Sequence, residues 1–242
     1  MNIIFKKIKK IYFKFIFFSP KLLSTITFIP FLYLCGWVLA TPILLLSLDK
    51  EKISLIGTIF TFLIFIFSLP KWFEIRWGLK NIWELLGVKK TKNNGKLIHS
   101  FIKGLFLAIV LLSLILIPIV GFGWGYWIGK ISLDILINAI FLLIGVGFAE
   151  ELVFRGWLLE ELKNQFGLKK AILAQASIFS AVHVGFDLPF WEMIGILTGL
   201  FFLGILLSLL RLNDNNSLWG SIGLHGGLVG IWFFINNGLI EF

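Results

Sequence analysis

Long apolar segments separated by short charged ones dominate the sequence from residue 22 onward. A hydrocarbon core about 30 Å thick requires roughly 20 helical residues to cross it. Seven segments approach or exceed that length: residues 22–48, 53–71, 104–122, 132–162, 170–187, 190–210 and 218–236. The pattern therefore predicts an all-α fold, a polytopic bundle of about seven transmembrane helices.

The beginning of the chain has a different pattern. Within residues 1–21, lysines flank an apolar stretch, Ile11 to Phe18, that is too short to span a bilayer. Such a segment is typical of a basic interfacial segment on the membrane surface. We therefore divide the chain into this segment, a part over 22–130 with N-terminal transmembrane helices and a basic cytoplasmic loop, and a core over 131–242.

Composition excludes an ordinary soluble domain. Hydrophobic residues make up 58% of the chain and charged residues only 14%, against about 25% charged residues in soluble domains. A soluble protein of this size could not hide so much apolar surface from water. The single cysteine, Cys35, allows neither an intrachain disulfide nor a thiolate metal site.

The net charge of +9 reflects membrane topology rather than nucleic-acid binding. Lysine and arginine gather in the N-terminal tail and in every second loop, and only Lys50, Lys52 and Lys130 occupy the opposite loops. Because cytoplasmic loops are enriched in cationic residues, this pattern predicts a cytoplasmic N-terminus. Three tryptophans among the charges of the longest loop, 71–96, predict an interfacial helix there: Trp72, Trp77 and Trp83.

Away from the ends of the predicted spans, the charged residues and histidines are few: Glu150, Glu151, Arg155, His183 and His225. A charge at mid-bilayer costs about 2.5–3.5 kcal/mol on insertion scales, so such residues usually face inward, form pairs and serve a function. Glu151 and Arg155 are four residues apart, which predicts an ion pair on one helix face. Glu150 points about 100° away from that face and is free for another task.

The predicted depths of the polar residues agree. Glu150 and His183 each lie about 20 Å along their helices from the cytoplasmic end, and His225 lies about 16 Å from that end. We therefore expect a carboxylate and two imidazoles to converge in one pocket. The carboxylate can act as a general base toward water, and the histidines can hold the water, polarise a carbonyl or bind a metal. One glutamate with two histidines is also a sufficient ligand set for catalytic zinc.

The motifs resemble those of the CPBP family, which contains CAAX proteases and bacteriocin-processing enzymes and is also called the ABI family. Residues 150–156 (EELVFRG) match its EExxxR motif, residues 179–183 (FSAVH) match FxxxH, and His225 stands where the last motif places a histidine. The stretch 199–204 resembles a weaker intervening motif. The match covers about residues 130–236.

The resemblance implies an intramembrane endopeptidase in which Glu150 activates water with help from His183 and His225. By the same resemblance, Glu151 and Arg155 hold the pocket and Phe179 packs beside it. Family members are commonly labelled metalloproteases, which points to zinc bound by the three catalytic residues. The expected partners are a peptide or protein substrate and membrane lipid, with no nucleic acid.

One position departs from the family pattern. The last motif is often HxxxN, and its asparagine is thought to stabilise the oxyanion, but this chain has Val229 at that place. Asn236 lies on the same helix face as His225 but about 16 Å away, so it is no simple replacement. The oxyanion donor is therefore unidentified.

Two other readings stay open. A catalytically inactive membrane adaptor of the same fold would explain Val229, and a transporter or proton relay would also use buried glutamate and histidine. The Lys-, Asn-, Ile- and Phe-rich composition is typical of a bacterial protein, here of the cytoplasmic or an internal membrane. The sequence indicates neither the substrate nor the oligomeric state.

Overall fold

The computed structural model describes residues 21–42, 50–89, 95–185 and 187–241. The predicted interfacial segment, residues 1–21, lies outside the described residues except for Lys21. The chain divides into two compact units, Met1–Ile82 and Trp83–Phe242, and each is treated by itself. The division at residue 130 expected from the sequence stays a prediction.

The first unit contains a helical hairpin of α2 (Lys21–Ala40) and α3 (Lys50–Trp77). The two helices approach closely at Gly36, where a Cβ atom would overlap the Thr61 side chain. Small residues at such a crossing let membrane helices pack tightly. Near the other end of the hairpin, Arg76 donates a hydrogen bond of 2.8 Å to the Lys21 carbonyl. The two helices of the hairpin are therefore in contact both near Gly36 and near Lys21.

The interfacial helix predicted for residues 71–96 is wrong at its beginning. Helix α3 continues to Trp77, and Trp72 is completely buried and stacks on Phe28 at a ring-centroid distance of 4.0 Å. Phe65, Leu69 and Trp72 recur at helical spacing and form one buried stripe. That stripe continues the apolar face of α3 past Lys71, the first charged residue after Lys52. Beyond it, α4 (Ile82–Leu85) is a single short turn.

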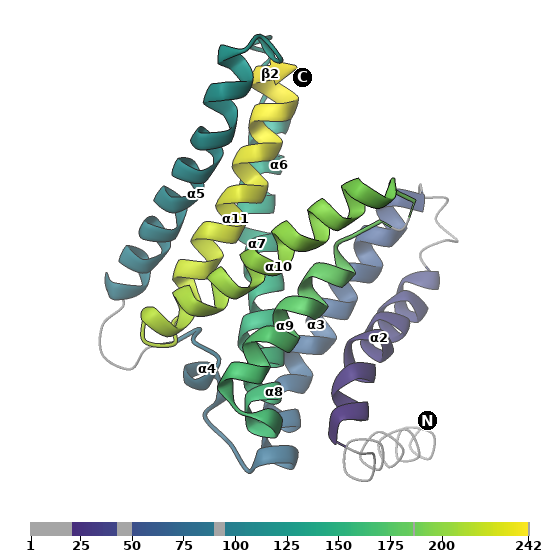
Figure 1. Ribbon diagram of the computed structural model, residues 1–242. Helices are drawn as coiled ribbons and strands as arrows, with labels where there is room; N and C mark the ends of the chain where they lie inside the picture. Colours follow the sequence, from purple (N-terminus) through teal and green to yellow (C-terminus); the bar gives the residue numbers. More distant parts are fainter. Residues whose placement is uncertain (1–20, 43–49, 90–94, 186, 242) are drawn as a thin grey trace. The chain divides into compact units, whose positions relative to one another are not determined.

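The second unit is a bundle built around a continuous helix over residues 133–166 (Figure 1). This helix changes from α to π geometry twice, through α6 (Leu133–Phe141), η2 (Leu142–Val146), α7 (Gly147–Glu151), η3 (Leu152–Leu158) and α8 (Leu159–Phe166). The other helices are α5 (Gly95–Gly121), α9 (Leu168–Val182), α10 (Phe190–Asn213) and α11 (Trp219–Phe234), which runs into the π segment η4 (Ile235–Leu239). Two short antiparallel strands, β1 (Tyr126–Trp127) and β2 (Ile240–Glu241), tie the end of α11 to the segment before α6.

The all-α polytopic class is confirmed, although the number of spans differs from the prediction. Among the described residues, six helices are long and apolar enough to cross a membrane. The fifth predicted span, 170–187, forms α9, which has only 15 residues and is therefore about 22 Å long. The helix ends at Val182 because the following residues include Gly185 and Pro189, and Pro189 opens α10.

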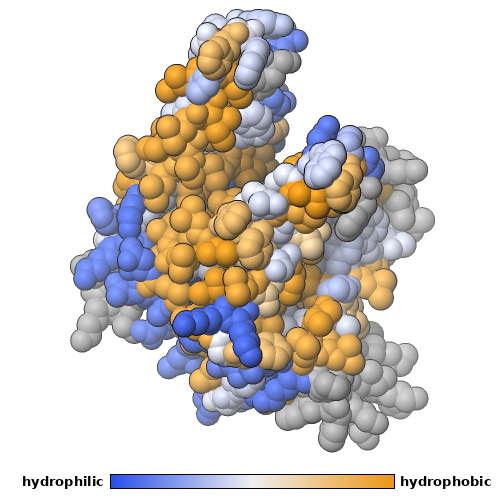
Figure 2. All heavy atoms as spheres, in the orientation of Figure 1, coloured by the Kyte–Doolittle hydropathy of each residue, from blue (hydrophilic) through white to orange (hydrophobic). Residues whose placement is uncertain are grey.

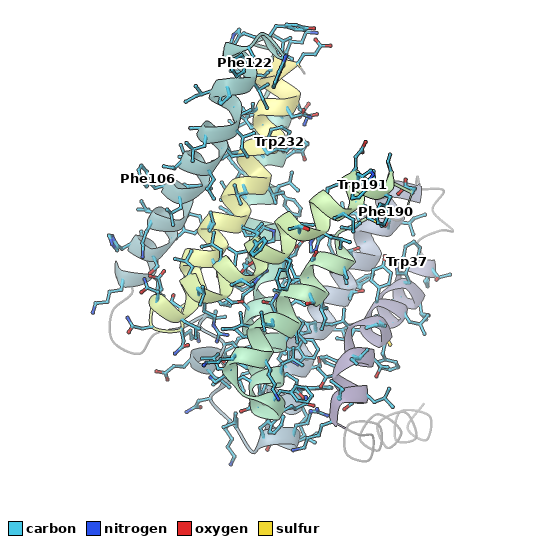
Figure 3. The ribbon with its side chains drawn as sticks, viewed as in Figure 1. Trp37, Phe106, Phe122, Phe190, Trp191 and Trp232 are labelled. Atoms are coloured by element: carbon cyan, nitrogen blue, oxygen red, sulfur yellow. The ribbon has the colours of Figure 1, made fainter. Side chains whose placement is uncertain are left out.

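The surface of the bundle suits a lipid environment. Apolar atoms cover the flanks of the long helices, while hydrophilic atoms gather near the start of α5 and the turn between α10 and α11 (Figure 2). Phe106, Phe122 and Trp191 point outward (Figure 3), with exposed fractions of 62%, 71% and 80%. Large apolar side chains exposed to this extent indicate contact with lipid rather than water. The protein is an integral membrane protein.

Glycines on α11 bring it against two neighbouring helices. A Cβ at Gly223 would overlap the Phe101 carbonyl on α5, and a Cβ at Gly226 would overlap the Leu143 carbonyl in η2. These contacts involve backbone atoms, which cannot move aside at low cost. Gly199 on α10, in contrast, has nothing within 4 Å of a Cβ position. Close helix packing at glycines therefore holds for α11 and not for every glycine.

This difference predicts opposite effects for one substitution at two sites. Gly199→Ala should leave stability unchanged or raise it slightly, because alanine favours helix by about 1 kcal/mol over glycine. Gly226→Ala should lower stability by about 1–3 kcal/mol, because the added methyl overpacks the contact with Leu143. Unfolding in detergent micelles measures both. Equal effects at the two positions would contradict the close approach of α11.

Candidate active site

Three polar residues from three helices meet at one point in the second unit. Glu150 lies on α7, His183 caps the end of α9, and His225 lies in the middle of α11. The Nε2 atom of His183 is 2.9 Å from Oε2 of Glu150, and the Nε2 atom of His225 is 3.7 Å from the same oxygen. The convergence expected from the depths of these residues is therefore present.

The two adjacent glutamates occupy different environments. Glu151 is fully buried, and its Oε1 lies 2.9 Å from Nη1 of Arg155, which is also fully buried. The same oxygen lies 2.8 Å from Nδ1 of His225. The Glu150 side chain, in contrast, is 29% exposed. The ion pair predicted from the four-residue spacing is confirmed, and it leaves Glu150 as the accessible carboxylate.

The hydrogen-bond partners assign a tautomer to both histidines. His183 Nδ1 lies 2.7 Å from the Phe179 carbonyl oxygen, which can only accept, so Nδ1 carries the hydrogen. His225 Nδ1 faces the Glu151 carboxylate, which already pairs with Arg155, so this nitrogen also donates. The Nε2 atom of each ring therefore faces Glu150.

Phe179 lies at the centre of this arrangement. Its side chain is fully buried. The centre of its ring lies 4.0 Å from Cζ of Arg155, 4.4 Å from the His183 ring centre and 5.5 Å from the His225 ring centre. The Arg155 contact is a cation–π interaction, which strengthens when the cation is desolvated. Phe179 thus packs beside the pocket as expected and separates the buried cation from the two imidazoles.

The sequence did not identify Arg211 and Glu160 as part of this region. The predicted span 190–210 places Arg211 in the following cytoplasmic loop, but Arg211 belongs to α10, is fully buried and forms a 3.0 Å ion pair with Glu160. A basic residue directly after an apolar segment usually marks a span end. No local sequence signal therefore distinguished Arg211 from an ordinary topogenic charge.

Val229, which stands where the family motif often has an asparagine, lies on α11. Val229 lines a groove of about 550 Å³ between α5, η2 and α11, together with apolar side chains such as Leu112 and Trp232. Asn236 lines the same groove. These contacts identify no oxyanion donor among the described residues. The valine side chain has no hydrogen-bond donor and does not replace the family asparagine.

The donor set suits zinc in its chemistry but not in its present geometry. In the described part of the chain, no group of three or more His, Cys, Asp or Glu side chains is arranged to hold a metal ion. The Nε2 atom of His183 instead lies within hydrogen-bonding distance of Glu150 Oε2, and the Nε2 atom of His225 lies 3.7 Å from the same oxygen. Zinc binding by these three residues stays a prediction, and metal analysis of the active protein tests it.

Protein-family models match two parts of the chain. Residues 132–231 match the family described as "Type II CAAX prenyl endopeptidase Rce1-like". Residues 6–81 match a domain of unknown function, DUF8676. No curated protein and no solved structure matched the chain.

The match over residues 132–231 supports an intramembrane endopeptidase in general. The match confirms the resemblance seen in the motifs: residues 132–231 are a member of the CAAX protease (CPBP) family. The first unit corresponds closely to the other match, since its boundary at Ile82 directly follows residue 81.

The buried ion pair predicts a large cost for removing one charge. Glu151→Gln should destabilise the protein by about 3–5 kcal/mol, because it leaves Arg155 as an uncompensated buried cation. The matched control is Glu74→Gln, which breaks the exposed pair between Lys71 and Glu74 and should change stability little. Unfolding in detergent measures both variants. A small effect at Glu151, similar to that at Glu74, would contradict the buried pair.

Proposed function

We propose that this protein is a membrane-embedded endopeptidase in which Glu150 activates the attacking water. The observation that carries the proposal is the orientation of both imidazoles: their Nδ1 atoms have partners elsewhere, while both Nε2 atoms face the single accessible carboxylate. Membership of residues 132–231 in a family of membrane endopeptidases supports it. The division of tasks between Glu150 and Glu151 supports it further.

The groups present can carry out a balanced hydrolysis. Glu150 accepts a proton from water, and the water oxygen attacks the carbonyl carbon of the scissile peptide bond. The carbon–nitrogen bond then breaks, and the same proton passes from Glu150 to the departing amine. His183 and His225, whose Nε2 atoms lie beside Glu150, hold the water in place. The Glu150 and His183 side chains are 29% and 28% exposed, which gives water and substrate access.

The proposed substrate is a peptide segment, such as a leader or a C-terminal tail, that reaches the pocket from the cytoplasmic side. The position of Val229 favours a second candidate, an adaptor that binds such a segment without cutting it. An adaptor would have no need for two fixed imidazole tautomers aimed at one carboxylate. The peptidase is therefore the function that we favour.

The substitution Glu150→Gln tests the peptidase directly. It keeps the size of the side chain and removes the proton acceptor, so cleavage should fall by at least about 10²-fold. Membrane-protein termini are compared in cells that lack the natural gene and produce either the original protein or the variant at equal abundance. We expect a set of new termini that depends on Glu150.

The matched control is Glu192→Gln, which makes the same chemical change at an exposed position on α10. This control should produce the same termini as the original protein. Identical termini for all three proteins, with the Glu150 variant still able to restore any phenotype of the deletion, would refute the peptidase and favour the adaptor.

A further inference from the structure

The helix that carries Glu150 has a buried backbone acceptor beside the site, the carbonyl of Arg155. In η3, the N–H of Leu159 bonds to the carbonyl of Phe154, five residues earlier, rather than to that of Arg155. The Arg155 carbonyl therefore lacks the donor that an α-helix would supply. A buried carbonyl without a donor is costly, so another group must satisfy it.

Arg211 on α10 is that group. Its Nη1 atom donates a hydrogen bond to the Arg155 carbonyl, and its Nη2 atom donates to the Leu85 carbonyl at 2.8 Å. The Nη2 atom also lies 3.0 Å from Oε1 of Glu160, whose side chain is 4% exposed. One guanidinium therefore joins α10, the π segment η3, α8 and the last residue of α4. Its planar set of donors is suited to several acceptors in fixed directions, whereas a lysine ammonium is not.

The backbone of Arg155 is coupled to the rest of the pocket through its side chain. That side chain pairs with Glu151, which in turn holds Nδ1 of His225. It also lies over the ring of Phe179, whose carbonyl holds Nδ1 of His183. A displacement of the Arg155 backbone would therefore disturb the orientation of both histidines.

We propose that Arg211 is a positioning residue of the active site: by binding the carbonyl that the π segment releases, it fixes Arg155 and, through Glu151 and Phe179, both imidazoles. The inference rests on the proposed peptidase function, because its main consequence is for cleavage. Nothing in the motifs of the family match identifies Arg211. It acts from a separate helix and contacts neither histidine nor Glu150.

Two substitutions separate positioning from simple stabilisation. Arg211→Lys keeps the charge beside Glu160 but loses the planar fork that reaches the Arg155 and Leu85 carbonyls. Glu160→Gln weakens the ion pair but leaves those carbonyl bonds in place. We expect Arg211→Lys to lower kcat per folded molecule at least about tenfold at unchanged KM, whereas Glu160→Gln should lower the unfolding temperature and keep kcat.

Cleavage is measured with purified full-length protein in lipid vesicles, on a peptide that spans a terminus found in the cell comparison. Arg76→Lys is the matched control, since Arg76 also donates to a helix carbonyl but lies in the first unit. Its kcat should stay unchanged. A wild-type kcat for Arg211→Lys would overturn the inference, while full activity of Glu150→Gln would overturn the peptidase instead.

A second readout does not depend on activity. The chain has only three histidines, so the ring nitrogens of His183 and His225 can be assigned by ¹⁵N NMR. Arg211→Lys should shift the signals of one or both rings toward a mixture of tautomers, and Arg76→Lys should not. Unchanged ring signals in the Arg211 variant would contradict its positioning role even if the peptidase itself is confirmed.

Discussion

The buried ion pair between Glu151 and Arg155 is the interaction on which the rest of the site depends. Removing two charges from water costs several kcal/mol per ion, and the pair needs further partners to offset that cost. Glu151 obtains one from Nδ1 of His225, and Arg155 obtains one from the face of Phe179. The partners that stabilise the pair are thus the same groups that orient the two imidazoles.

The helix that carries this pair cannot keep regular α geometry throughout. Gly147 N–H bonds to the Leu142 carbonyl rather than to that of Leu143, and Leu159 shows the same five-residue pattern in η3. Each π segment leaves a carbonyl without its α-helical donor. The Leu143 carbonyl lies against Gly226 of α11, next to His225, and the Arg155 carbonyl accepts from Arg211 of α10. The irregular backbone therefore fixes the register of two neighbouring helices on either side of the glutamates.

Much of the site was predictable because helical spacing is a local property. The four-residue interval between Glu151 and Arg155 and the common depth of the three candidate catalytic residues follow from the rise and turn of an α-helix, and the distances agree. The π segments were not predictable, since they depend on acceptors and close contacts supplied by other helices. Arg211 was missed for the same reason. Trp72 was misplaced because its charged neighbours concealed a buried stripe that continues from Phe65.

The early end of α9 explains how a polar site can be open inside a membrane bundle. His183 is the C-cap of α9, with φ −101° and ψ 0°, a bridge conformation in which many active-site residues are found. Had α9 continued as a full span, the next turn of helix would extend past His183 and cover its side of the pocket. Ending the helix at Val182 instead leaves His183 and Glu150 partly exposed while Glu151, one residue away, stays fully buried. The proposed hydrolysis needs this asymmetry, because water must reach Glu150 but must not reach Glu151, which contacts His225.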